Sequence, residues 1–497
     1  MKSMSKLFDE KSAYHANPSE NTVHRSSLLV TEMPETTAEI TFLNHFFLKR
    51  NYKNVGCRIT GIDPEGGRIK SVLYPITEPR VYEFNLSKEF SGHASNYLVE
   101  FFAAENLFIP FPAVMINHRG QGFHNTVHVN NRILNDVFEN DQINARDVQE
   151  SAIDVQINDD GSTFFIFATG ILPVQNVLDI ELQTNAETIN KEISVNLPRL
   201  SSRLFILKDI FPNVNISNGA ATLKIKQPKQ PLFFDRLIAG ILRNDGAFTA
   251  NHSYYDSTEV LDYWKDQHEA YAVYPFIKSL DNSIRVYPIM TPSNLRMFIS
   301  IHNKEGQTLA KLPVGEISSP GGEILEASVN EVITNQGYKL SDVASFCLWA
   351  QSELEKLPTR INHQMIYRDK GLGCSINTSL TNESHKSWNA ANKLSWGQLL
   401  VGRDYKTWLG FVFRRPNGAS HTLKITYYDK AGKIHTTEKE LPARGSVIVN
   451  VTAEFGEPES DEARYIWYTA ECQRQDLSAW TVSQNLTTGH CSGEHSF

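Results

Sequence analysis

Three histidines recur at one position of an internal repeat, and three imidazoles could bind a metal ion. Each follows a glycine by six residues, and successive markers lie roughly 120 residues apart in the 497-residue chain, which indicates tandem copies of one unit. The remaining copy of the marker, third in chain order, is an asparagine. The glycine and marker pairs are Gly122–His128, Gly246–His252, Gly371–Asn377 and Gly489–His495.

Neutral imidazoles suit Zn²⁺, Fe²⁺ or Cu²⁺, and an open fourth position would let such an ion activate water or dioxygen. If the units close into a ring, pseudo-symmetry could gather His128, His252 and His495, with Asn377 as a weak ligand or orienting a bound water. The alternative is structural, because His and Asn can both hydrogen-bond the backbone where a strand ends. In a linear array the markers would lie tens of ångströms apart. Each sandwich is several strand lengths in extent, and a strand rises about 3.3 Å per residue. We favour the structural interpretation.

Two further histidines, His118 and His124, precede His128 on a glycine-rich hairpin. The three could chelate one ion locally, but their spacing matches no established ligand signature. We favour solvent-facing loop histidines.

The C-terminal segment places Cys491 between His490 and His495, which raises the hypothesis of a thiolate nucleophile. A nucleophile needs a base held by tertiary structure, and neighbouring strand residues point to opposite faces. We therefore favour a free thiol. Glu494 could orient the His495 ring as an outer-shell carboxylate or face solvent, and we favour solvent.

Familiar catalytic signatures are missing: there is no GxSxG elbow, P-loop, HExxH, CxxC or dinucleotide fingerprint. The favoured function is a non-catalytic, multi-domain binding or assembly protein that presents repeated loop ends, with carbohydrate or protein as the ligand class. The alternative is a metal-dependent enzyme with the three-histidine site. Several aromatic residues could stack on sugars, although core packing is the favoured role: Trp388, Trp396, Trp408, Trp480, Tyr254 and Tyr255.

Strand and turn signals recur in the same register as the markers. About 31 residues before each marker lies a run with β character: Tyr97–Phe102, Ala221–Lys226, Phe346–Ala350 and Arg464–Thr469. Farther upstream lie hairpin-like turns, at 63–67, 184–186, 303–306 and 429–432, and prolines that introduce the next strand, at Pro75, Pro198, Pro320 and Pro442. The segment His421–Asp429 alternates apolar and polar residues and predicts a half-buried strand.

These signals predict an all-β protein of four tandem antiparallel β-sandwich units. The units are immunoglobulin-like in their pattern of strands and turns and are joined by short helical linkers. Helical pattern is expected at Asn131–Ser151 and Ser257–Ala270, and in a turn around Val329–Thr334. The predicted divisions are a polar arm at 1–35 and units at 36–130, 131–257, 258–385 and 386–497, the middle two including their linkers.

Composition limits the partners and the location. The net charge is -8, and no sustained basic stripe is present, so nucleic acid is an unexpected partner. No apolar run of signal-peptide or membrane-spanning character occurs, so we expect a soluble protein without membrane insertion. Five sparse cysteines give no disulfide framework and suggest reduced thiols in the cytoplasm.

Overall fold

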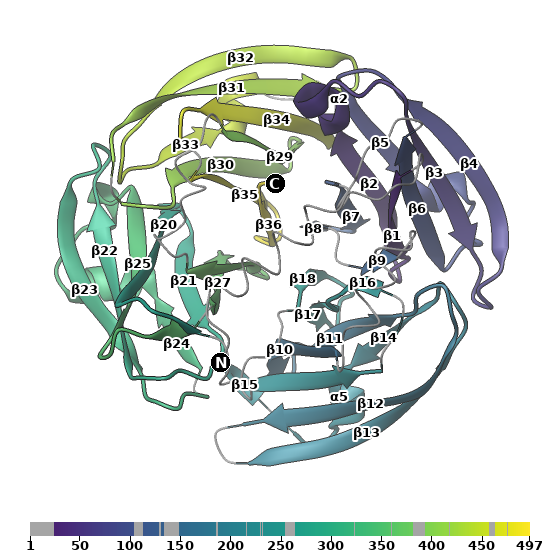
Figure 1. Ribbon diagram of the computed structural model, residues 1–497, viewed down its shortest axis with the longest axis horizontal. Helices are drawn as coiled ribbons and strands as arrows, with labels where there is room; N and C mark the ends of the chain where they lie inside the picture. The colour runs from purple at the N-terminus through teal and green to yellow at the C-terminus, as the bar shows by residue number, and fades with distance from the viewer. Residues whose placement is uncertain are drawn as a thin grey trace. The chain divides into compact units, whose positions relative to one another are not determined.

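The computed structural model describes residues 24–103, 113–128, 131–133, 149–184, 187–214, 216–228, 230, 232–253, 264–322, 324–358, 360–380, 393–416, 418–456, 463–474 and 476–497 (Figure 1). The chain divides into two compact units between Asp256 and Ser257. Nearly all of the described secondary structure is antiparallel β-sheet, which confirms the predicted all-β fold.

The first sandwich occupies residues 24–128. Its sheets have the strand orders β1-β6-β3-β4 and β5-β2-β7-β8. Because β1 begins at His24, the predicted boundary of the polar arm at residue 35 is too late. The elements are β1 His24–Thr31, β2 Thr37–Leu43, α2 His45–Arg50, β3 Val55–Ile62, β4 Arg68–Ile76, β5 Val81–Asn85, α3 Leu86–Glu89, β6 Asn96–Ala103, β7 Met115–Gly120 and β8 Phe123–His128.

The second sandwich occupies residues 149–252. Its two halves, β13-β12-β15-β10 and β14-β11-β17-β18, join into one sheet through the pair Ile157 and Ser162. The elements are β10 Gln149–Ile157, β11 Gly161–Ala168, β12 Val174–Gln183, β13 Thr188–Leu197, β14 Ser202–Ile206, α5 Leu207–Ile210, β15 Ile216–Gln227, β17 Ile238–Arg243 and β18 Phe248–His252; a separate ribbon pairs β9 Asn131–Ile133 with β16 Leu232–Asp235.

The third sandwich occupies residues 269–380, with the strand orders β20-β25-β22-β23 and β24-β21-β27-β28. A short ribbon pairs β19 Trp264–Lys265 with β26 Leu357–Pro358. The remaining elements are β20 Glu269–Pro275, β21 Asp281–Val286, β22 Leu295–His302, β23 Thr308–Ile317, β24 Leu325–Ser328, α6 Val329–Asn335, a 3₁₀ turn at Leu340–Asp342, β25 Ser345–Ser352, β27 Ile361–Arg368 and β28 Cys374–Leu380.

The fourth sandwich occupies residues 393–495, with the strand orders β29-β34-β31-β32 and β33-β30-β35-β36. The elements are β29 Lys393–Val401, β30 Tyr405–Phe413, β31 His421–Asp429, β32 Gly432–Leu441, β33 Val447–Asn450, α7 Val451–Phe455, β34 Arg464–Cys472, β35 Leu477–Asn485 and β36 Cys491–His495.

One strand order recurs in these four segments. Numbered within a sandwich, one sheet reads 1-6-3-4 and the other 5-2-7-8. The neighbours 2 and 5, and 3 and 6, correspond to the B–E and C–F pairs of immunoglobulin sandwiches. The edges are exchanged, because strand 1 lies beside strand 6 and strand 7 beside strand 2. The predicted immunoglobulin-like arrangement is therefore present in the pairing of the central strands.

The predicted turns join strands 3 and 4 of each sandwich. The first runs from Asp63 to Gly67, and Asp63 Oδ1 accepts a hydrogen bond from Gly67 N at 2.7 Å. Gly66, Gly306 and Gly432 have positive φ in the corresponding turns, which favours glycine over residues with a Cβ. Of the second turn, Asn185 and Ala186 lie outside the described residues.

Within the described residues, the helices lie inside the sandwiches, and the described ends of the two expected helical linkers are strand instead of helix. A short helix follows strand 5 in each sandwich: α3, α5, α6 and α7. Asn85, Ser328 and Asn450 cap three of these with side-chain oxygens. Asn131–Ile133 and Gln149–Ser151 are strand where helix was predicted, as are Trp264–Lys265 and Glu269–Ala270, and the middle of both linkers lies outside the described residues.

Within each unit, two sandwiches pack against each other in the same way. The turn at Gly66 packs on Pro198 and Arg199 of the second sandwich. The equivalent turn at Gly306 packs on the segment Pro442–Gly445 of the fourth. Strand 8 of one sandwich also contacts strand 8 of its neighbour, β8 with β18 and β28 with β36. Each unit is therefore a pair of sandwiches with a repeated interface.

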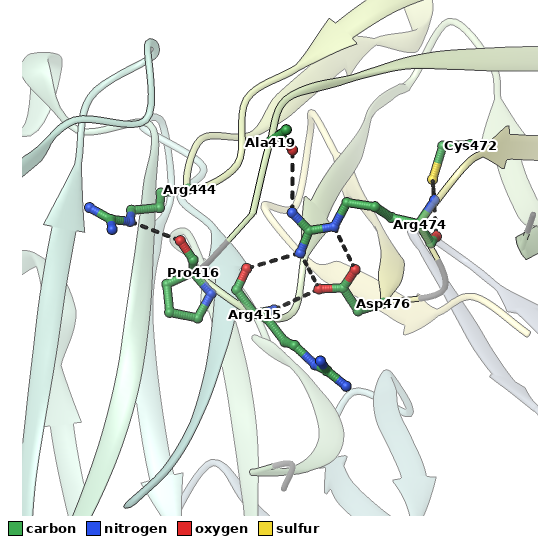
Figure 2. A network of polar contacts seen from close by, with 7 residues as sticks. All are labelled: Arg415, Pro416, Ala419, Arg444, Cys472, Arg474 and Asp476. Carbon is green, nitrogen blue, oxygen red and sulfur yellow. Dashed lines mark hydrogen bonds and ion pairs between the residues drawn. The ribbon is translucent and has the colours of Figure 1, made fainter. Parts of the chain in front are cut away.

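An ion pair fixes the loops at one end of the fourth sandwich (Figure 2). Arg474 Nη2 lies 2.5 Å from Asp476 Oδ2, and this carboxylate also accepts a hydrogen bond from Arg415 N at 3.0 Å. Arg474 Nη1 donates to Ala419 O at 3.4 Å. The pair thus links the connection after β30 to the connection after β34, and serves structure.

Candidate metal centre

The marker residues lie on strand 8 of each sandwich, so they occupy equivalent positions, as the spacing of the repeat predicted. His128, His252 and His495 are the last residues of β8, β18 and β36. A glycine with positive φ forms the turn before each of these strands, at Gly122, Gly246 and Gly489. The turn therefore sets the start of strand 8, and the strand carries the histidine to its far end.

His128 and His252 meet within the unit Asn17–Asp256. Their ring centroids are 4.8 Å apart at an interplanar angle of 80°, and their ligating nitrogens lie within 4.8 Å of each other. Asn125 Oδ1 accepts a hydrogen bond from Ala250 N at 2.8 Å, which ties β8 to β18 close to the two rings. This histidine cluster is compatible with metal binding.

His252 is held by its backbone and by its ring. His252 N donates to Asn251 Oδ1 at 2.7 Å, and the ring Nδ1 lies 2.8 Å from Ser253 O. Arg236 Nη1 also lies 3.2 Å from Nδ1, but the carbonyl contact is shorter and requires the proton on Nδ1. We assign that tautomer, which places the ring lone pair on Nε2, the nitrogen that could bind a metal.

His495 repeats this arrangement in the unit Ser257–Phe497. His495 N donates to Glu494 Oε1 at 2.9 Å, and the ring Nδ1 lies 2.9 Å from Ser496 O. The same tautomer leaves Nε2 as the ligating nitrogen. The two histidines therefore also fit the structural interpretation, since both bond the backbone where strand 8 ends.

Glu494 is buried, at 2% exposure, so the expectation that it faces solvent is wrong. It lies on β36 between Gly493 and His495, opposite Thr481 of β35. Its Oε1 is 3.8 Å from His495 Nε2. The sequence showed the neighbouring histidine but not the sheet pairing that covers this carboxylate.

His118 and His124 are buried strand residues, so the expectation of solvent-facing loop histidines is wrong. His118 Nε2 lies 3.0 Å from Thr31 O, and its ring packs against Phe248. Burial lowers the pKa of His118 to about 4 and that of His124 to about 3. In the hairpin His124 shares a face with His128 while His118 points to the other, which disfavours a local three-histidine chelate.

Asn377 lies within β28 and accepts a hydrogen bond from Tyr287 Oη at 2.7 Å. The marker residue of the third sandwich therefore bonds a tyrosine side chain. Asn251 and Arg236 were not predicted, and the only signal for the first was its place beside a marker histidine.

The cysteines are buried free thiols. Burial raises the pKa of Cys491 to about 12, so its thiolate is not populated near neutral pH. This supports the inert thiol over the nucleophile. Trp396, Trp408 and Trp480 are buried, which fits the expected core packing; Trp388, Tyr254 and Tyr255 lie outside the described residues.

No protein-family model and no curated protein matches the sequence. Solved structures give only distant likenesses. Bacteroides uniformis beta-glucuronidase 2 matches 46% of this chain and 26% of its own, so the likeness spans about a quarter of that protein, at 10% identity and a TM-score of 0.15. A tetra-tandem repeat from the extending region of a large adhesion protein matches 89% of this chain and 91% of its own, at 10% identity and a TM-score of 0.09.

The viral chemokine binding protein R17 of rodent gammaherpesvirus Peru matches 75% of this chain and 88% of its own, at 6% identity and a TM-score of 0.16. TM-scores this low carry no argument about fold or function. In the part of the chain that the structure describes, no helix has the length and apolar character needed to cross a membrane.

Proposed function

We propose that this chain is a multi-domain β-sandwich binding or assembly protein in which His128, His252 and His495 bind one transition-metal ion, Zn²⁺, Fe²⁺ or Cu²⁺. The observation that carries the proposal is the matched geometry of His252 and His495. Both rings bond the following carbonyl through Nδ1, at 2.8 and 2.9 Å, which orients Nε2 as a ligand. His128 packs against His252, and His495 is the proposed third ligand on the strength of the repeat.

A non-catalytic role is favoured by the ionisation of the buried groups. Burial lowers the pKa of His118, His124, His302 and His363 and raises the pKa of Cys57, Cys347, Cys374 and Cys491. General acids and bases work best with pKa values near the operating pH. These groups are instead held neutral, as structural side chains are.

The second candidate is a metal-dependent enzyme. Three imidazoles leave coordination positions open, and a bound ion there would activate water or dioxygen. The repeated strand ends would then surround a reaction centre instead of a ligand. Carbohydrate or protein as the ligand of the binding role, and a cytoplasmic location, stay proposals from the sequence.

The test is elemental analysis of the untagged protein after loading with Zn²⁺, Cu²⁺ or anaerobic Fe²⁺ and desalting. We expect about one ion per chain, and at least a tenfold weaker affinity in H252A and in H495A, since losing one of three ligands cripples a site. His93→Ala replaces an exposed histidine of the first sandwich and should retain the ion. Absence of metal from the loaded wild type, or full retention in H252A, would reject the shared site.

The enzyme candidate has its own readout. Oxygen consumption by the Fe²⁺-loaded protein, or hydrolysis of activated esters by the Zn²⁺-loaded protein, that disappears in H252A would favour catalysis. Metal binding without either activity favours the binding role.

A further inference from the structure

A row of aromatic side chains crosses the outer face of one sheet of the third sandwich. In this aromatic row, Trp349 of β25 lies between Tyr271 of β20 and Phe298 of β22, each directly opposite it. Leu348 and Ala350, which flank Trp349 in the strand, are fully buried in the core, so the indole points to the other face. Trp349 and Phe298 are half-buried there. Rings placed in this way can stack on the apolar face of a sugar.

The rings of the aromatic row are supported by one another and by a lysine. Tyr271 is buried, and its ring centroid lies 4.5 Å from that of Trp349 at an interplanar angle of 52°. Lys311 Nζ lies 4.6 Å from the ring centroid of Phe298 and 5.2 Å from that of Trp349. The lysine side chain is exposed, so its ammonium can also donate hydrogen bonds to a ligand that lies on the rings.

A row of hydrogen-bonding side chains, the polar row, runs beside the aromatic row on the same face. Gln351 follows Trp349 by two residues in β25 and lies opposite Glu269 and Arg296. Gln351 Nε2 lies 3.1 Å from Glu269 Oε1 and 3.1 Å from His268 Nε2, so both contacts use the amide nitrogen. The amide oxygen can therefore accept a hydrogen bond from a ligand hydroxyl. Planar polar groups beside aromatic rings match the two kinds of surface that a sugar presents.

The fourth sandwich shows how the same position accommodates a further ring. Trp467 is equivalent to Trp349 and is fully buried. The ring of Phe497 stacks nearly parallel to it, with centroids 6.3 Å apart and an interplanar angle of 5°. Among the described residues of the third sandwich, the ring that contacts Trp349 is Tyr271 of its own row. The third sandwich therefore keeps the aromatic row without the additional stacked ring.

We propose that the aromatic row and the polar row bind an extended neutral polysaccharide, whose sugar faces stack on the half-buried rings and whose hydroxyl groups bond the polar row. The row is straight, because its members lie on neighbouring strands about 4.8 Å apart, which suits a linear chain of sugars. Arg296 Nη2 lies 3.7 Å from Glu353 Oε1, and Glu269 offsets the charge of Lys311, so the surface favours a neutral ligand. This names a ligand class for the proposed function and rests on its binding role, not on its metal ion.

The experiment is affinity electrophoresis of the full chain through gels that contain hydroxyethyl cellulose, xylan or galactomannan, with a chelator present so that bound metal plays no part. We expect at least one of these neutral polysaccharides to retard the wild type. Trp349→Ala should weaken that binding about tenfold, because the indole supplies the largest stacking surface. The control Tyr338→Ala removes a 38% exposed aromatic residue that follows α6, and should change binding by less than about twofold.

Gln351→Ala separates a loss of binding from a loss of fold. Its side chain is half-buried at the surface, so the variant should melt close to the wild type while polysaccharide binding falls about fivefold. Wild-type binding by folded Q351A and W349A overturns the inference. So does a wild type that is retarded by none of the three polysaccharides, or only by the acidic polygalacturonate.

Metal loading of the same proteins tests the proposed function separately. We expect W349A and Q351A to load metal as the wild type does, because the aromatic row is distinct from the histidine cluster. A wild type that binds polysaccharide but no metal supports the inference and rejects the shared metal site. A wild type that binds metal but no polysaccharide overturns the inference and leaves the metal site in place.

Discussion

The two units share one strand order but stabilise the same position of strand 6 differently. In the unit Asn17–Asp256, cross-strand partners there are charged: Arg58 opposite Glu100, and Glu181 opposite Lys224. In the unit Ser257–Phe497, the equivalent partners are aromatic: Phe298 opposite Trp349, and Tyr428 opposite Trp467. Because both chemistries occupy one register, strand order here depends on the turns and on the apolar alternation of the strands, not on particular cross-strand pairs.

Strand 8 shows the opposite behaviour. The hydrogen bonds around His252 and His495 are nearly identical in the two units, although the preceding residue is Asn251 in one and Glu494 in the other. The pairs of strand 6 vary between the units, whereas the ring geometry of His252 on strand 8 is repeated at His495. That contrast is what a shared binding role at the strand ends would produce.

The largest expected effect is a loss of stability when an aromatic partner on strand 6 is removed, compared with the loss when a charged partner is neutralised. Trp467 is fully buried, so Trp467→Ala should lower the free energy of unfolding by about 3 to 5 kcal/mol. Glu100→Gln should cost about 1 kcal/mol or less, because its partner Arg58 is 38% exposed and water can solvate it. Urea unfolding followed by tryptophan fluorescence and circular dichroism measures both. Equal losses would mean that the charged pair matters as much as the aromatic one.

Acid should weaken both units to a similar degree. His118 and His124 in one unit, and His302 and His363 in the other, have folded-state pKa values of about 3 to 4, below the usual 6.5. The unfolded chain therefore binds more protons, so stability is full above pH 6.5 and falls as pH drops toward 4. At pH 5 each histidine should cost about 2 kcal/mol. Urea midpoints at pH 7 and pH 5 test this, and His363→Gln should flatten the dependence.

The sequence predicted the features that are local. Each predicted turn and each strand 6 run depends on a few neighbouring residues, so the register of Gly122 with His128 could be read directly. The burial of His118 could not, because it results from Phe248, a residue of the next sandwich. Glu494 was misplaced for the same reason, since its environment is set by strand pairing. The pairing of strand 1 with strand 6 and of strand 7 with strand 2 likewise depends on contacts between distant parts of the sequence, which the alternation of apolar residues does not specify.

The smallest expected effect compares the turns that pack on a neighbouring sandwich with one that does not. A Cβ at Gly66 would meet Arg199 O, whereas one at Gly432 would have nothing within 4 Å, although both have positive φ. Gly66→Ala should therefore lower stability by about 2 to 3 kcal/mol and Gly432→Ala by about 1 kcal/mol. Thermal melts of the two variants measure the difference. If G432A were as damaging, backbone strain alone would account for both glycines.

The most direct test of the central claim is to count the imidazoles that bind one ion. The untagged protein is loaded with one equivalent of Cu²⁺, and pulsed electron paramagnetic resonance measures the modulation from the remote nitrogens of coordinated histidines. A shared site predicts three coordinated imidazoles in the wild type and two in each of H128A, H252A and H495A. A spectrum with no coordinated imidazole, or one unchanged in all three variants, would contradict it.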